Sequence, residues 1–135
     1  MNRYLVLAIA LGFAPIDAAQ ATPMRMATFE KVVLSGSRLI VGSFSSLDPT
    51  CRSLGPFTVS LIDPPQDGHV QIGQGEDFPN FSMFNVRARC NTRKRPATLV
   101  FYTATPGYTG PDEFSIELVD PRGNVGRARY RLMVR

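Results

Sequence analysis

The segment from Tyr102 to Arg135 constrains the fold most, because it has the pattern of a turn, a strand, a second turn and a final strand. Prolines and glycines between positions 106 and 111 are too closely spaced for a helix or a central strand. Phe114–Val119 then alternates in the period of two that is typical of a strand with one buried face. Asp120–Gly123, with the sequence DPRG, has the residues of a type I turn. The segment therefore predicts a β-hairpin.

The returning strand of this hairpin separates apolar and basic side chains. Its two faces carry Ala128, Tyr130, Leu132 and Val134 on one side and Arg127, Arg129, Arg131 and Arg135 on the other. An amphipathic helix is the competing interpretation, but strict alternation does not fit a 3.6-residue period. We therefore expect a strand with an arginine-lined outer face.

The rest of the chain has the composition of short strands and turns. The expected strands are Thr28–Leu34, Arg38–Phe44, Phe57–Ile62, His69–Ile72, Met83–Cys90 and Thr98–Thr103. The expected loops between them are Ser45–Pro56, Gly73–Ser82 and Asn91–Pro96. About eight short strands separated by turns favour a β-sandwich over a barrel. We expect residues 22–135 to form one all-β domain of about 7–8 strands.

The turns also carry a family resemblance. The pattern is Tyr102-x3-Pro106-x3-Gly110-x-Asp112-x-Phe114, followed by Asp120-x2-Gly123. It resembles the ending of bacterial immunoglobulin-like and cadherin-like domains, although Ile116 stands where that ending often has a second tyrosine. The resemblance implies an immunoglobulin-like Greek-key sandwich, in a chain similar to small secreted two-cysteine proteins of α-proteobacteria. It is silent on function, because this fold hosts many unrelated activities.

Residues 1–21 have the pattern of a secretory signal peptide. Arg3 supplies the positive charge, Leu5–Ala14 the apolar stretch, and Ala19–Ala21 an A-x-A cleavage site. The stretch is too short to span a bilayer, and no cysteine lies near the cleavage site to receive a lipid. A buried N-terminal strand is the alternative. The pattern predicts a periplasmic or extracellular protein with no membrane span.

The two cysteines, Cys51 and Cys90, are expected to form a disulfide in an exported chain. The expected strand Met83–Cys90 would place Phe84, Val86 and Ala88 on the same face as Cys90. The spacing is short and the chain has no Trp, so the bridge should not be the inter-sheet pin of antibody domains. Two free thiols with a catalytic or metal role remain the alternative.

Signals of catalysis and of cofactors are weak. The one histidine, His69, sits between a turn and a strand, and no nucleophile signature accompanies it. One histidine and two bridged cysteines do not make a convincing zinc site. Calcium at Asp112 and Asp120 is the remaining metal question, although both residues also suit structural roles in turns. We expect no enzyme and no cofactor.

The basic residues are the best functional candidates in a chain of net charge +4. They form two groups, Arg87, Arg89, Arg93, Lys94 and Arg95 around one turn and Arg127, Arg129 and Arg131 on the last strand. Arginine favours bidentate contacts with carboxylate and phosphate. The alternative interpretation is a solvated face that discourages edge pairing, with Glu117 offsetting part of its charge across the strand. Nucleic acid is disfavoured by export and by the lack of aromatic residues among the arginines.

These patterns predict a non-enzymatic exported module of the bacterial cell envelope. Its arginine-rich face would bind anionic envelope polymers or an acidic protein. The alternative is a small secreted inhibitor or stability factor that acts on another envelope protein through its loops. Phe78 and Phe81 could form an exposed apolar contact site, or fold back onto the edge of the sandwich. The sequence leaves open the ligand, the oligomeric state and whether the two basic groups share one surface.

Overall fold

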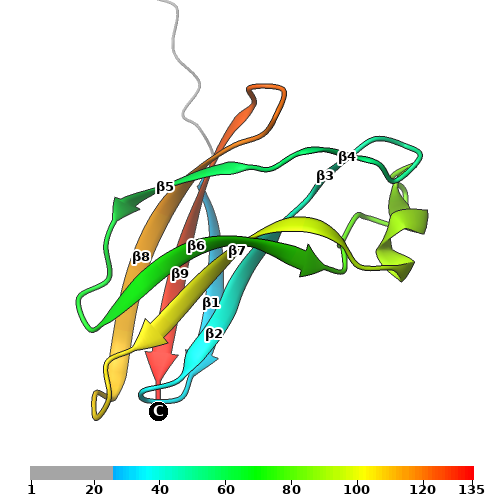
Figure 1. Ribbon diagram of the computed structural model, residues 1–135. Coiled ribbons are helices and arrows are strands. Elements are labelled where there is room, and N and C mark those ends of the chain that lie inside the picture. The colour runs from blue at the N-terminus through cyan, green and yellow to red at the C-terminus, as the bar shows by residue number, and fades with distance from the viewer. Residues whose placement is uncertain (1–25) are drawn as a thin grey trace, which may run out of the picture.

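Two β-sheets form the body of the molecule in the computed structural model, which describes residues 26–135 (Figure 1). Its elements are β1 (Met26–Val33), β2 (Arg38–Phe44), β3 (Ser46–Leu47), β4 (Ser53–Gly55), β5 (Thr58–Asp63), β6 (Gly68–Asp77), the 3₁₀ helix η1 (Ala88–Thr92), β7 (Arg95–Ala104), β8 (Gly110–Val119) and β9 (Val125–Val134). The sheets have the strand orders β1-β9-β8-β5 and β2-β7-β6, while β3 and β4 pair separately. The expected all-β sandwich is confirmed.

The predicted hairpin at the end of the sequence is present as β8 and β9. The Gly123 N–H donates to the carbonyl of Asp120 at 2.9 Å, which closes the turn. The Asp120 carboxylate accepts from the N–H groups of Arg122 and Asn124 at 2.8 and 3.0 Å. On the outer side of β9, the edge strand β1 pairs in parallel, with Met26 opposite Arg127 and Val33 opposite Val134.

A row of stacked aromatic rings begins at the exposed Phe29 on the edge strand and continues into the core. Phe29, Tyr130 and Phe114 lie opposite one another on β1, β9 and β8, with ring centroids 5.4 and 4.9 Å apart. Tyr102, from β7 of the other sheet, continues the row at 6.1 Å from Phe114. On β2, Gly42 leaves room for the Tyr130 hydroxyl, because a Cβ there would lie 2.4 Å from that oxygen. These rings hold the two sheets together.

Strand β6 is longer than predicted, since it continues from Ile72 to Asp77 into the expected loop Gly73–Ser82. Its two interior glycines obscured it in the sequence. A Cβ at Gly75 would lie 2.8 Å from Leu99 Cδ1, and one at Gly73 would lie 3.3 Å from the Phe101 ring. Large side chains of the central strand β7 therefore cover the glycines, and small residues are needed at both positions.

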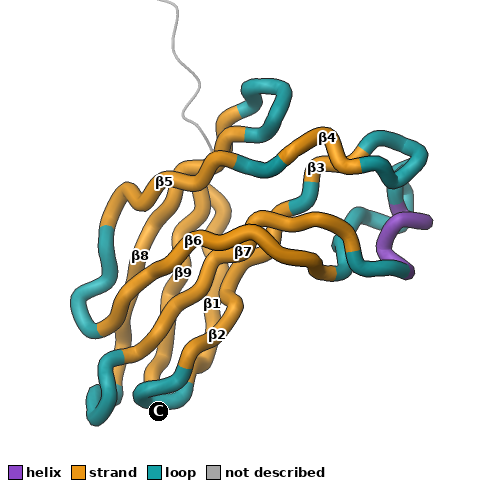
Figure 2. The backbone as a smooth tube through the Cα atoms, viewed as in Figure 1, coloured by secondary structure: helices purple, strands orange, loops and turns teal. Residues whose placement is uncertain are grey.

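The predicted strand Met83–Cys90 is wrong. This segment makes successive turns and enters η1, which forms the far end of the molecule (Figure 2). Phe84 is 92 % exposed and does not share a buried face with Cys90. The alternation that suggested a strand is overridden by Ser82 and Asn85, whose side chains hydrogen-bond to nearby backbone N–H groups and so stabilise turns.

The Cys51–Cys90 disulfide is present, with 5.5 Å between the two Cα atoms. It lies in a small second cluster with Leu47, outside the main core, and so it is not a pin between the two sheets. The signal-peptide prediction for residues 1–21 falls outside the described residues. Within residues 26–135, no helix is long and apolar enough to cross a membrane.

Candidate binding surfaces

The disulfide lobe, defined as Ser46–Gly55 together with Phe78–Lys94, projects from one end of the three-stranded sheet (Figure 1). The cystine joins its two segments and packs with Leu47 and the half-buried Phe81. Phe81 thus folds back onto the lobe, whereas Phe78 is exposed. The lobe has a small apolar centre of its own, which supports the surrounding side chains.

Hydrogen bonds from side chains to the backbone fix the two segments of the lobe. The Asn91 side chain accepts from the Phe81 N–H at 3.0 Å and donates to the Phe81 carbonyl at 2.9 Å. Arg87 Nε donates to the Leu47 carbonyl at 2.6 Å, and Arg89 donates to the carbonyl of Pro49. Two of the predicted binding arginines therefore also tie the lobe together.

The lobe is basic, and its cations have no carboxylate partners. In the described part of the chain, ion pairs within 4.0 Å involve only Arg122, Arg127, Arg129 and Arg131. The lobe cations, which we define as the basic residues of the lobe together with the adjoining first residue of β7, take part in none of them: Arg52, Arg87, Arg89, Arg93, Lys94 and Arg95. Arg93 and Lys94 are exposed, and the Lys94 ammonium lies 5.9 Å from the centre of the Phe78 ring.

Arg52 was missed by the sequence analysis, which grouped basic residues by their separation along the chain. It directly follows Cys51, so the disulfide brings it beside η1. The nearby carboxylate of Asp48 is already occupied, because it accepts from the Thr50 hydroxyl and from the Thr50 and Arg52 N–H groups. The Thr50 hydroxyl bond lowers the pKa of Asp48.

The arginines of β9 are in a different electrostatic state. Arg127 makes a 3.0 Å ion pair with Glu117, while Arg131 and Arg129 lie 3.2 and 3.5 Å from Glu113. The predicted outer arginine face is therefore present, but its three arginines are paired with the two glutamates of the neighbouring strand β8. Figure 1 shows β9 within the four-stranded sheet and η1 at the far end of the molecule, so the two basic groups lie on separate surfaces.

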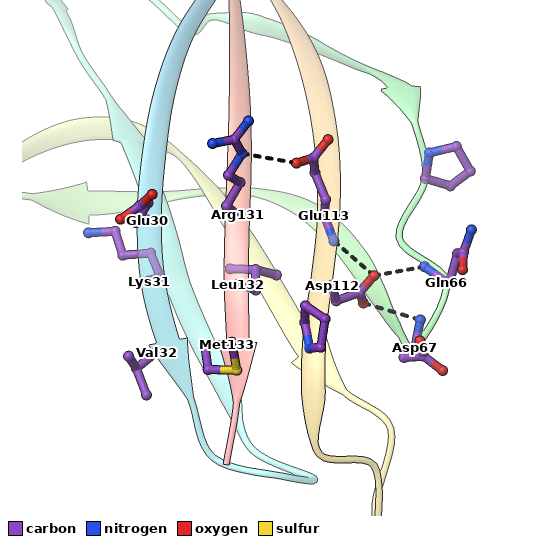
Figure 3. A pocket seen from close by; sticks show the side chains of 12 residues that line it. Glu30, Lys31, Val32, Gln66, Asp67, Asp112, Glu113, Arg131, Leu132 and Met133 are labelled. Atoms are coloured by element: carbon purple, nitrogen blue, oxygen red, sulfur yellow. Dashed lines mark hydrogen bonds and ion pairs between the residues drawn. The ribbon is translucent and has the colours of Figure 1, made fainter.

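A shallow groove of about 770 Å³ crosses the outer face of β1, β9 and β8 and reaches the β5–β6 turn (Figure 3). Strand register explains its composition. One row across the strands is charged and consists of Glu30, Arg131 and Glu113. The next row on the same face is apolar, with Val32 on β1 opposite Met133 on β9. Acidic and basic groups alternate in the groove, and it therefore has no excess positive charge with which to attract an anion.

Asp112 lies at one end of this groove and is only 8 % exposed. Its carboxylate accepts from the N–H groups of Gln66, Asp67 and Glu113 at 3.0, 3.1 and 2.9 Å. It also accepts from the Tyr102 hydroxyl at 2.7 Å. Burial, followed by this hydrogen bond, raises the pKa of Tyr102. Asp112 thus anchors the β5–β6 turn to β8.

The other residues considered for chemistry are dispersed. His69 is exposed on β6 opposite Thr103. Asp120 is occupied by its own turn, and its hydrogen bonds, above all with Asn124, lower its pKa. Across residues 26–135, no group of three or more His, Cys, Asp or Glu side chains is placed to hold a metal ion.

The most exposed apolar residues were also missed by sequence reasoning. Met83, Phe84 and Val86 are 80, 92 and 68 % exposed at the end of the disulfide lobe. Ser82 and Asn85 flank the first two of them, and both residue types favour turns. That flanking pair is the signal that would have indicated a projecting turn.

Comparison with known proteins does not extend these observations: no protein-family model matches the chain, and no curated protein matches it either.

Proposed function

We propose that the protein is an exported, non-enzymatic binding module of the bacterial cell envelope, which contacts anionic envelope components through its lobe cations. The observation that carries this proposal is the contrast between the two basic groups. The lobe cations have no carboxylate partners within the described residues, whereas Arg127, Arg129 and Arg131 are paired. The disulfide lobe is therefore the surface with the greater electrostatic attraction for an anion.

The chemistry of the lobe fits phosphate or carboxylate groups. Arg87 and Arg89 use N–H groups in bonds to the lobe backbone, which positions their guanidinium groups. Arg93 and Lys94 extend from the end of η1 and are open to solvent. Because a guanidinium has five N–H donors, an arginine fixed by one of them retains others for an anion.

Export and the immunoglobulin-like classification belong to the same proposal. A disulfide in a chain of this size is typical of oxidising compartments, and it supports the export predicted from residues 1–21. The division of the seven long strands into sheets of four and three supports an immunoglobulin-like sandwich.

The test is binding of inorganic polyphosphate by two variants that each lose two positive charges. Arg93→Ser/Lys94→Ser removes exposed lobe cations, and Arg127→Ser/Arg129→Ser removes paired ones. We expect the first variant to bind at least about fivefold more weakly and the second to stay within about twofold of wild type. Raising the salt concentration from about 50 to about 500 mM should weaken wild-type binding steeply.

Equal losses in both variants would contradict the assignment to the lobe, and absence of polyphosphate binding would contradict the anion proposal as a whole. A pull-down from envelope extracts distinguishes anion binding from the alternative function, inhibition or stabilisation of another envelope protein. A protein partner that stays bound at high salt, in both variants, would favour contacts through apolar loop residues instead.

A further inference from the structure

The end of the disulfide lobe exposes large apolar side chains, which are usually buried in a folded protein. Met83 and Phe84 are adjacent in sequence, and both are at least 80 % exposed, while Val86 and Phe78 are more than half exposed. We call Met83, Phe84 and Val86 the apolar tip. Adjacent, strongly exposed apolar residues on one protrusion indicate a contact surface rather than scattered surface hydrophobes.

Hydrogen bonds hold the apolar tip in a defined conformation. The Asn85 N–H donates to the Ser82 carbonyl at 2.8 Å, which places Met83 and Phe84 at the centre of a turn. The side-chain oxygen of Asn85 accepts from the Arg87 N–H at 2.9 Å. The backbone carbonyl of Asn85 accepts from the Ala88 N–H at 2.9 Å. The tip is thus presented in a fixed geometry, which reduces the entropy that a partner would have to remove.

The electrostatic surroundings of the apolar tip indicate what it meets. Residues 78–95 include no Asp or Glu but contain Arg87, Arg89, Arg93, Lys94 and Arg95. The one carboxylate of the lobe, Asp48, is taken up by hydrogen bonds from Thr50 and Arg52. A surface that combines exposed apolar side chains with an excess of cations is complementary to one type of environment, an apolar layer covered by anionic groups. A lipid bilayer with anionic headgroups has that composition.

We infer that the apolar tip inserts into the interface of an anionic lipid bilayer, with the lobe cations contacting the headgroups. This inference rests on the proposed anion binding and names the ligand of that same surface. Met83 and Phe84 would enter the boundary between headgroups and acyl chains, at a depth of about 5–10 Å. The body of the sandwich would remain outside, since the lobe projects from one end of it (Figure 2).

A projecting turn suits a bilayer better than a protein partner. A protein-binding apolar surface usually has a polar rim whose charges complement those of one partner. Within residues 78–95 every charged side chain is basic, which gives attraction to a negatively charged plane without choosing among partners.

Tryptophan fluorescence provides a direct test, because the chain contains no Trp. Phe84→Trp places a single reporter at the apolar tip, and Val125→Trp places the matched control at the β8–β9 turn, where Val125 is also exposed. Both proteins are mixed with vesicles of phosphatidylcholine alone or with about 30 % phosphatidylglycerol, in lipids that carry a quencher on the acyl chains. We expect a blue shift and quenching only for the tip reporter, and only with anionic vesicles.

The inference of insertion would be overturned if the protein sedimented with anionic vesicles while the fluorescence of the tip reporter stayed unshifted and unquenched. That result would leave anion binding intact and exclude insertion. A shift that required an envelope protein and not lipid would also overturn it, in favour of a protein contact. If the protein bound neither vesicles nor polyphosphate, the proposed function would fail as well.

A second pair of variants keeps the two proposals distinguishable. Met83→Ser/Phe84→Ser should weaken binding to anionic vesicles by about tenfold or more, because the inserted apolar area is lost. The same variant should bind soluble polyphosphate as wild type does, whereas Arg93→Ser/Lys94→Ser should weaken both. An unchanged urea midpoint for each variant would show that the exposed substitutions leave the fold intact. Equal vesicle binding by wild type and the Met83→Ser/Phe84→Ser variant would refute insertion.

Discussion

Replacing Asp112 with Asn tests whether a single carboxylate holds the β5–β6 turn against the sandwich. The Asp112 side chain accepts four hydrogen bonds in a nearly buried site. The amide oxygen of Asn can keep the two donors on Oδ1, the N–H groups of Gln66 and Glu113. Its NH₂ group would then face the Asp67 N–H and the Tyr102 hydroxyl, which now donate to Oδ2.

The expected loss follows from these two contacts. Hydrogen bonds to a charged group contribute about 1.5–3 kcal/mol each, and an unsatisfied buried donor has a cost of similar size. The Tyr102 hydroxyl can rotate and accept from the new amide, which recovers part of the loss. The backbone N–H of Asp67 can only donate, so it would be left without an acceptor. We therefore expect Asp112→Asn to lower the free energy of unfolding by about 2–4 kcal/mol.

Urea unfolding followed by circular dichroism measures this change. With a slope of about 1–3 kcal/mol per molar urea, the midpoint should fall by about 1–3 M. The control is Glu113→Gln, an exposed carboxylate one residue away, for which we expect a change of at most about 0.5 kcal/mol. Equal midpoints for Asp112→Asn and wild type would refute the anchoring role.

Three further predictions concern the packing, the cross-link and the alkaline limit of the fold. Gly68→Ala should lower the free energy of unfolding by about 1–3 kcal/mol in the same urea assay, because the new Cβ would lie 2.6 Å from the Thr103 carbonyl oxygen. Replacing Cys51 and Cys90 by Ala should cost about 4 kcal/mol, because the bridge closes a loop with a sequence separation of 39; a loss below about 1 kcal/mol would contradict this. Burial raises the pKa of Tyr130 to about 12. The stability that the protonated side chain contributes to the fold is therefore fully present below the ordinary pKa of 10 and is lost as the pH rises through 12. Urea midpoints should fall over that range for wild type and less for Tyr130→Phe.

The strands were predictable wherever one face is buried and the turn residues are distinctive. Arg38–Phe44 was placed with the bounds that β2 has in the structure, and the β8–β9 turn was placed at Asp120–Gly123. For Asp112 the sequence left open a structural role in a turn and a calcium site. Its partners on the β5–β6 turn, Gln66 and Asp67, are more than forty positions away, and no local pattern reveals such a contact.

The lobe was misjudged because local alternation does not report exposure. Phe84 and Val86 match a strand pattern, yet their exposure depends on the turn that Asn85 forms and on how the cystine closes the lobe. Pairing of charges was foreseen for Glu117 but not for Glu113. The β9 arginines and the lobe cations look alike in sequence, and only the strand register places Glu113 and Glu117 opposite Arg131 and Arg127.

The parallel pairing of β1 with β9 determines the order in which the chain can complete its structure during synthesis. Met26 pairs with Arg127, so the first described strand has no partner until nearly all of the domain has been made. At about 5–20 residues per second, this wait is roughly 5–20 s. Cys51 and Cys90 both precede β8 and β9, so in an oxidising compartment the lobe can be cross-linked while the edge of β1 is still open. A chain paused at this stage exposes an unpaired strand, and passage to an oxidising compartment before folding would lengthen the time for which aggregation competes with closure of the sheet.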